Sequence, residues 1–216
     1  MNMTRSPAFR YVFPFFLFMF LTECQRFGSE TTVFWIYGLK TILTLAALGF
    51  CFRGRFSEIQ GTWDYRAALL GLLVLLLWLL LGSWVPGARG ITFDPGAVPA
   101  GIPRTTAILF RILGAALAVP IMEELFWRSF WMRWWIDRDF QSIPVGRYTA
   151  FSFWITVGAF SLAHRPWEWP GTLATGILYG AYLIKTGNLR GCILAHAVTN
   201  AGLAAYVLAT GAWYYW

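Results

Sequence analysis

Long apolar stretches alternate with short polar connections along the whole chain, and this pattern predicts the fold. The stretch AALLGLLVLLLWLLLGSW has no polar face, which a helix on the surface of a soluble protein would need. Several other stretches approach the ~20 residues with which a helix crosses the hydrocarbon core of a membrane. We therefore expect an all-α fold, a polytopic transmembrane helical bundle of about seven (six to eight) spans, because backbone groups in lipid must bond within their own segment. The apolar stretches are residues 11–25, 33–52, 67–85, 105–122, 150–164, 171–184 and 191–210.

Composition agrees with a membrane protein and argues against an ordinary soluble enzyme. Of the 216 residues, 58% are hydrophobic and 12% are charged, which is far from the usage of soluble domains. Neither a repeat nor a long linker divides the chain, so we expect a single integral membrane domain over residues 1–216. Residues 1–104 would supply accessory N-terminal transmembrane helices.

The basic residues are distributed unequally between the two sides of the expected bundle. With a cytoplasmic N-terminus, the inner side holds Arg5, Arg10, Arg53, Arg55, Arg66, Arg133, Arg138, Arg147, Lys185 and Arg190. The outer side then holds Arg26, Arg89, Arg104 and Arg165. Because Lys and Arg favour cytoplasmic connections, we expect the N-terminus inside. The net charge of +7 then reflects topology and contact with membrane lipids, and we expect no nucleic acid partner.

Two adjacent acids, Glu123 and Glu124, follow an apolar stretch and need an explanation. A charge at the centre of a membrane helix costs roughly 2.5–3.5 kcal/mol on insertion scales. Arg128 lies four residues after Glu124, on the same helical face, and predicts an ion pair. Pro120 either kinks the helix or begins a new one with both acids in its first turn. The alternative is that the span ends at Ile121 and the acids lie among lipid headgroups.

The only two histidines of the chain, His164 and His196, also occur in or beside apolar stretches. Asn200 follows His196 by four residues on one helical face, and Phe160 precedes His164 by four, so its ring would pack beneath the imidazole. A single intramembrane histidine is usually a packing group. Two histidines, an asparagine and an acidic pair on three apolar segments instead predict one convergent polar site.

These motifs resemble a known family of membrane enzymes. Glu123-Glu124-x-x-x-Arg128, Phe160-x-x-x-His164 and His196-x-x-x-Asn200, in this order on successive apolar stretches, resemble the CAAX prenyl protease and bacteriocin-processing family of intramembrane endopeptidases. The resemblance covers residues 105–205, which would form the catalytic core. The sequences EELFWRSF and AHRPWEW also resemble a narrower bacterial branch of this family, which is associated with exosortase sorting systems. Ser129 departs from the family, which usually has glycine after the arginine.

The resemblance implies hydrolysis of a peptide bond by water that a glutamate activates. Glu123 would be the general base and His164 would share the water, while His196 and Asn200 would donate hydrogen bonds to the oxyanion. Glu124, Arg128 and Phe160 would support these four residues. The implied partners are a membrane-associated protein or peptide substrate and an exosortase-type sorting system, and the implied location is the bacterial inner membrane.

Whether the site holds a metal stays open from the sequence. Glu123, His164 and His196 match the ligand set of two histidines and a carboxylate that is typical of catalytic zinc. No H-E-x-x-H spacing is present. We favour no cofactor, with zinc or another divalent metal as the alternative.

Two other functions remain open. One is a non-catalytic membrane scaffold or immunity protein of the same fold, although all six polar motif residues are intact. The other is a small proton-coupled transporter, for which repeated halves would be expected and none is found.

The expected spans place the residues of the polar site at different depths in the membrane, which conflicts with a single site. Glu123 and His196 would lie near the inner ends of their spans, with His196 ~9 Å from that end. His164 would lie ~21 Å from the inner end of its own span. Either a span boundary or the topology must therefore differ from this scheme.

Overall fold

The computed structural model describes residues 6–29, 31–53, 57–59, 61–62, 64–82 and 93–216. Within these ranges the chain is helical and contains no strand, which confirms the all-α prediction. Seven helices lie in the described part, at the places of the seven predicted apolar stretches. They are α1 (Phe9–Gln25), α2 (Thr32–Cys51), α3 (Tyr65–Gly82), a continuous helix from Ile102 to Trp134, α7 (Ala150–Leu162), α8 (Trp169–Thr186) and α9 (Leu189–Thr210).

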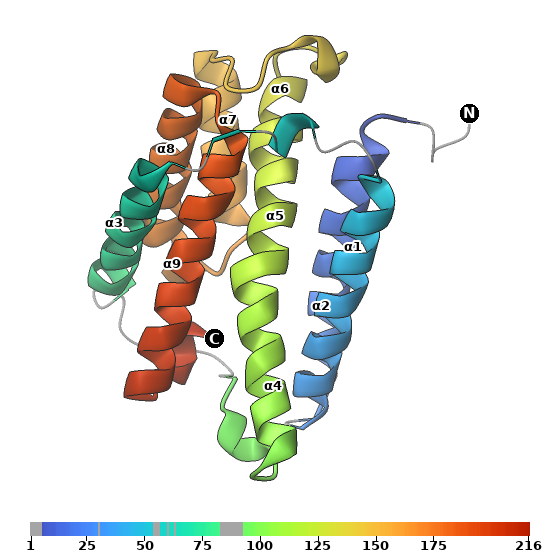
Figure 1. Cartoon of the computed structure of the whole chain (residues 1–216), viewed down its shortest axis with the longest axis vertical. Helices are drawn as coiled ribbons and strands as arrows, with labels where there is room; N and C mark the ends of the chain where they lie inside the picture. The colour runs from blue at the N-terminus through green and yellow to red at the C-terminus, as the bar shows by residue number, and fades with distance from the viewer. Residues whose placement is uncertain (1–5, 30, 54–56, 60, 63, 83–92) are drawn as a thin grey trace.

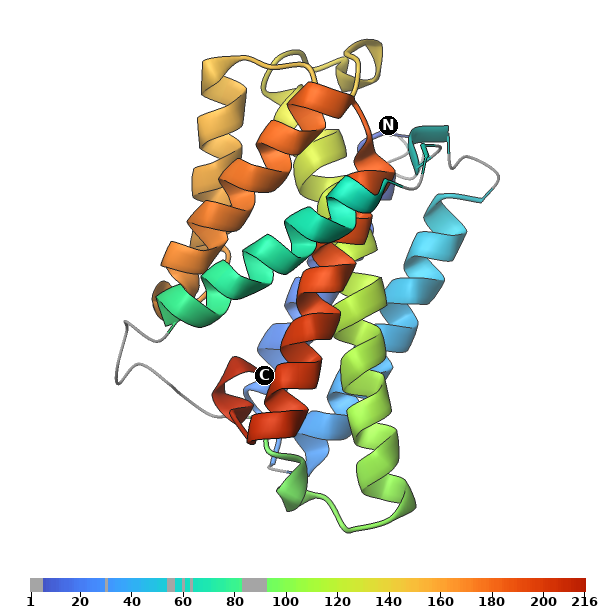
Figure 2. The same ribbon diagram turned by 60° about the vertical axis from the view of Figure 1, so that its left-hand side comes forward.

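The continuous helix lies at the centre of the bundle (Figure 1). It comprises α4 (Ile102–Leu113), α5 (Val119–Glu123) and α6 (Met132–Trp134), joined by two π-helical segments. The pair α1 and α2 lies on one side of it, and α3, α7, α8 and α9 lie on the other. Figure 2 shows that α3 runs obliquely across α9. The central helix therefore has neighbours on both sides that can bring side chains to it.

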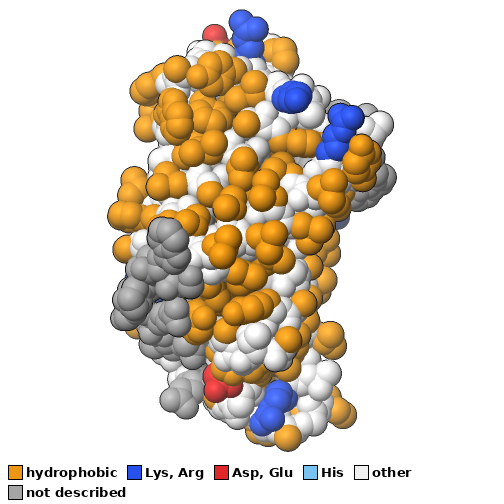
Figure 3. Space-filling model, turned by 90° about the vertical axis from the view of Figure 1, so that its left-hand side faces the viewer, with side chains coloured by type: hydrophobic (Ala, Val, Ile, Leu, Met, Phe, Trp, Pro, Cys, Tyr) orange, Lys and Arg blue, Asp and Glu red, His pale blue; other side chains and the backbone are white. Residues whose placement is uncertain are grey.

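The protein is an integral membrane protein. Four helices, namely α2, α3, the 33-residue central helix and α9, are long and apolar enough to cross a membrane, whereas the apolar α7 has 13 residues. On α3, Leu76 is 57% exposed and Leu80 is 62% exposed. Figure 3 shows hydrophobic side chains over most of one face, with charged side chains gathered towards its two ends. This distribution suits a surface that faces lipid.

The fourth predicted span is too short, and the structure corrects its end. The helix does not stop at Ile121 or Met122 but continues to Trp134. Pro120 neither begins a new helix nor breaks this one, because it follows a π-helical segment, Gly114–Ala118. In that segment the N–H of Val119 bonds to the carbonyl of Gly114, five residues back. The wider π-helical turn accommodates a proline that would disrupt the hydrogen bonds of a regular α-helix.

Short 3₁₀ turns lie in two of the connections between the helices. Residues 131–149 are partly helical, since α6 ends at Trp134, and continue as a loop with a short 3₁₀ turn at Phe140–Ser142. In the connection that precedes α4, residues 83–92 lie outside the described residues, and a 3₁₀ turn forms at Pro95–Ala97. Arg5, Arg55 and Arg89 also lie outside the described residues.

Candidate active site

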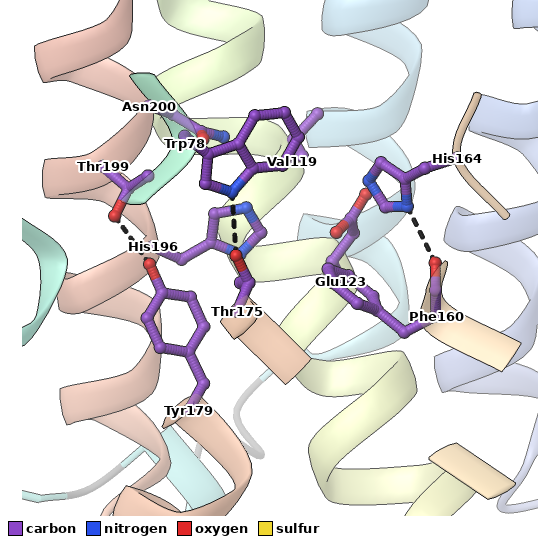
Figure 4. A pocket seen from close by; sticks show the side chains of 10 residues that line it. All are labelled: Trp78, Val119, Glu123, Phe160, His164, Thr175, Tyr179, His196, Thr199 and Asn200. Atoms are coloured by element: carbon purple, nitrogen blue, oxygen red, sulfur yellow. Dashed lines mark hydrogen bonds between the residues drawn. The ribbon is translucent and has the colours of Figure 1, made fainter. Parts of the chain in front are cut away.

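A cavity of about 90 Å³ lies where α3, α5, α7, α8 and α9 meet. It brings together Glu123, His164, His196 and Asn200, the four residues expected to act on substrate (Figure 4). The side chains of Glu123 and His164 point towards one another in this view. The remaining lining residues are Trp78, Val119, Phe160, Thr175, Tyr179 and Thr199.

The extended central helix removes the conflict in depth between Glu123 and His164. Glu123 lies 11 residues before the helix end at Trp134, or about 16 Å at the rise of an α-helix. His164 follows the C-terminal end of α7, about 21 Å from the start of that helix by the same measure. Glu123 is therefore deep in the bundle rather than at the edge of a span, and it can meet His164.

Glu124 lies behind the cavity and is fully buried between two positively polarised groups. Its Oε1 is 2.9 Å from Nδ1 of His196, and its Oε2 is 3.3 Å from Nε of Arg128. The guanidinium of Arg128 in turn lies 4.4 Å from the ring centre of Phe160. Glu124 and Arg128 thus form the ion pair that the spacing predicts, and this pair reaches the cavity through His196.

His164 is oriented by the last turn of α7, the helix that precedes it. Its Nδ1 is 2.8 Å from the carbonyl oxygen of Phe160, and the two rings are 4.7 Å apart. A carbonyl accepts, so Nδ1 carries the hydrogen and the neutral ring keeps a free lone pair on Nε2. The chain places this acceptor beside Glu123.

Pro120 explains how Asn200 is held. In the π-helical register the carbonyl of Ala115 would accept from the N–H of residue 120, but proline has none. Nδ2 of Asn200 donates to this carbonyl at a distance of 2.8 Å. One amide hydrogen of Asn200 is thereby fixed, and the other remains for a ligand in the cavity.

A second hydrogen-bonded chain connects three helices at the cavity. Tyr179 on α8 bonds to the hydroxyl of Thr199 on α9 at 2.7 Å, and Thr199 lies 2.7 Å from the carbonyl of Gly71 on α3. Trp78 on α3 donates to Thr175 on α8 at 2.8 Å. Sequence reasoning missed all four side chains of these bonds, because Trp, Tyr and Thr are ordinary residues of membrane helices and carry no charge that marks them.

Ser129, the departure from the family pattern, contacts a different part of the chain. Its hydroxyl bonds to the carboxylate of Glu58, and Glu58 also pairs with Arg133 at 2.8 Å. Ser129 is fully buried and does not line the cavity. Through this hydrogen bond, Ser129 holds the connection between α2 and α3 against the central helix.

The residues of the cavity have donor atoms that suit a divalent metal. His164 and His196 each use Nδ1 for a carbonyl or carboxylate, which is how metal-bound histidines are usually held. Among the residues that the structure describes, however, no three His, Cys, Asp or Glu side chains are grouped so that they could hold a metal ion. We therefore derive no step through a metal.

Comparisons with known proteins bear on this arrangement. Residues 105–202 match the family model of the Rce1-like type II CAAX prenyl endopeptidases. No curated protein and no solved structure matches the chain. The matched stretch includes every motif residue from Glu123 to Asn200 and excludes α1, α2 and α3; the exosortase-associated branch stays a prediction. Over residues 105–202, the chain is therefore similar to the Rce1-like type II CAAX prenyl endopeptidases.

Proposed function

We propose that this protein is an intramembrane endopeptidase that hydrolyses a peptide bond of a membrane-associated protein or peptide with water activated by Glu123. The observation that carries the proposal is the convergence of Glu123, His164, His196 and Asn200, from separate parts of the chain, on one cavity. A carboxylate and an imidazole acceptor on one side, with donors on the other, are the groups that peptide hydrolysis needs.

The first step is addition of water to the scissile carbonyl. Glu123 takes a proton from the water while Nε2 of His164 accepts its other hydrogen bond, and the water oxygen adds to the carbonyl carbon. His164 fits this role as a neutral acceptor because its Nδ1–H is already given to Phe160. The result is a tetrahedral oxyanion and a protonated Glu123.

The oxyanion is stabilised by Asn200 and His196. Asn200 donates its second amide hydrogen. Since Nδ1 of His196 donates to the Glu124 carboxylate, Nε2 can donate only when the ring holds a second proton, as an imidazolium. Glu124 supports that charged state at close range, so its place behind the cavity has a chemical reason.

Collapse of the oxyanion completes the reaction. The C–N bond breaks, the nitrogen of the leaving amine takes the proton from Glu123, and the carbonyl reforms in the new carboxyl end. Glu123 is then ready for another water, so the balance needs only water and peptide. No cofactor enters this scheme, and zinc or another divalent metal remains the alternative to be tested by its removal.

We further propose a bacterial inner membrane location with a cytoplasmic N-terminus. The end of the bundle that holds the N-terminus also holds the α6–α7 and α8–α9 connections (Figure 1), which carry the greater share of Lys and Arg. In a variant without Cys24, Cys51 and Cys192, a membrane-impermeant maleimide added to intact cells should label Ala100→Cys and not Gln141→Cys. The reverse labelling would overturn the orientation.

The deciding experiment compares new peptide termini in membranes that contain the wild type or Glu123→Gln at equal level. Mass spectrometry should find a discrete set of termini that Glu123→Gln reduces by about 10²–10⁴-fold, the usual contribution of a general base. Glu23→Gln is the matched control, because Glu23 is an exposed acid paired with Arg26 far from the cavity. Identical profiles from a folded wild type and Glu123→Gln would favour the non-catalytic scaffold instead.

A further inference from the structure

One wall of the cavity comes from outside the stretch that matches the family. Trp78 belongs to α3, whereas the family match begins at residue 105. The chemistry of the family's motif residues therefore does not account for this side chain, and its role must follow from its place.

The backbone of α3 is fixed tightly at the cavity. A Cβ at Gly71 would lie 2.4 Å from the carbonyl oxygen of Ala195, so only glycine allows α3 and α9 to cross this closely. The hydroxyl of Thr199 lies 2.7 Å from the carbonyl of Gly71 at the same crossing. Trp78 follows two turns later on a helix that cannot easily shift.

The indole of Trp78 is fixed as well. Its Nε1 donates to Thr175 at 2.8 Å, and Thr175 donates to the carbonyl of Gly171 at 2.8 Å. A Cβ at Gly171 would lie 3.0 Å from Cδ2 of the indole, so the ring packs directly on the backbone of α8. The ring is a rigid wall rather than a mobile side chain.

This wall lies between the cavity and the outer surface of α3. In Figure 4 the indole and the side chains of His196 and Asn200 lie to one side of Glu123 and His164. Leu76 and Leu80, its neighbours on α3, are mostly exposed on the surface suited to lipid. Trp78 is therefore one of the side chains that a substrate bound among the four polar residues would contact.

We propose that Trp78 determines substrate specificity by limiting the side chains beside the scissile bond to small ones such as Gly, Ala and Ser. The inference rests on the proposed endopeptidase function. The cavity of about 90 Å³ is smaller than the cavity of about 150 Å³ that holds one benzene molecule in an engineered protein core. A peptide group with its attacking water would leave little of this space for a Leu or Phe side chain, which would have to displace the fixed indole.

The test uses the purified full-length protein in liposomes and a proteome-derived peptide library as the probe. Mass spectrometry identifies each cleaved bond, and the best peptide is then made with Ala or Leu beside that bond. We expect the wild type to prefer Ala, and Trp78→Ala to raise the Leu-to-Ala ratio of kcat/KM about ten-fold or more, as expected when a pocket gains several methylenes. This ratio is independent of the folded fraction, since both peptides meet the same protein sample.

Matched variants separate the size of Trp78 from other effects. Trp78→Phe keeps most of the wall and should keep the preference for Ala, and Trp154→Ala, on the exposed side of α7, should leave the ratio unchanged. A Trp78→Ala ratio equal to that of the wild type overturns the specificity role alone. If the wild type gives no products that Glu123→Gln abolishes, the proposed function fails and the specificity role falls with it.

Discussion

Oε1 of Glu124 lies 2.9 Å from Nδ1 of His196, yet only His196 lines the cavity. A buried carboxylate behind the cavity therefore sets the proton arrangement of a side chain in front of it. The same carboxylate pairs with Arg128, so one residue links the stability of the bundle to the proposed chemistry.

Glu124→Gln should lower kcat by about 10²–10³-fold, the usual loss when one oxyanion donor is removed. A neutral amide no longer supports the imidazolium form of His196. The variant should also lose roughly 3–5 kcal/mol of unfolding free energy, because Arg128 is left as a buried charge without its partner. Single-turnover cleavage and thermal unfolding in detergent measure the two effects.

The double variant Glu124→Gln with Arg128→Met separates these effects. Removing both charges should recover most of the lost stability, but His196 still lacks its carboxylate, so activity should stay low. Recovery of activity together with stability would show that Glu124 acts only through folding.

Pro120→Ala tests how Asn200 is held. Alanine supplies a backbone N–H that can bond to the carbonyl of Ala115, and it then competes with Nδ2 of Asn200. We expect kcat to fall, by up to about 100-fold if Asn200 moves by 1 Å, while the melting temperature stays equal or rises. Asn200→Asp in the same background should then cost less than in the wild type, and an equal cost would contradict the coupling.

Ser129→Ala tests the attachment of the α2–α3 connection. Loss of the hydrogen bond to Glu58 should cost about 1–3 kcal/mol of unfolding free energy, with kcat/KM unchanged because Ser129 does not line the cavity. Ser142→Ala is the control, since its hydroxyl bonds to Asp139 at an exposed position and the change should stay within about 0.5 kcal/mol. A large loss of kcat/KM in Ser129→Ala would mean that the connection shapes the cavity.

Chelation tests the choice between water activated by Glu123 alone and a metal. Dialysis against EDTA, followed by 1,10-phenanthroline, should leave the rate of cleavage unchanged. The metal content of the purified protein should likewise be the same in the wild type and His164→Ala. A rate that falls on chelation and returns with Zn²⁺ would favour the ligand set of Glu123, His164 and His196.

The sequence predicted the helices and the polar cluster well, because both depend on strong local signals. Apolar stretches that are long enough to span a membrane form helices in lipid. Intramembrane Glu and His residues need one another as hydrogen-bond partners. The end of the fourth span was wrong for a related reason. The apolar stretch ends before Glu123, but the charged residues that follow do not end the helix, because Arg128 is buried against Glu124 and Arg133 against Glu58.

Other features depend on contacts that the sequence does not display. Trp78 lies in an apolar helix and resembles its neighbours until the crossing of α3 with α9 places it at the cavity. The bond from Asn200 to Ala115 depends on a π-helical register, for which Pro120 alone is an ambiguous signal.

The position of Glu123 along the central helix fixes the distance of this residue from the end of the helix. About 16 Å of helix separates this residue from the end at Trp134, and an extended chain covers about 3.3 Å per residue. A peptide that enters from that end must therefore thread about five residues before a bond reaches the carboxylate. The distance from the end of the central helix at Trp134 to Glu123 thus corresponds to about five residues of extended chain.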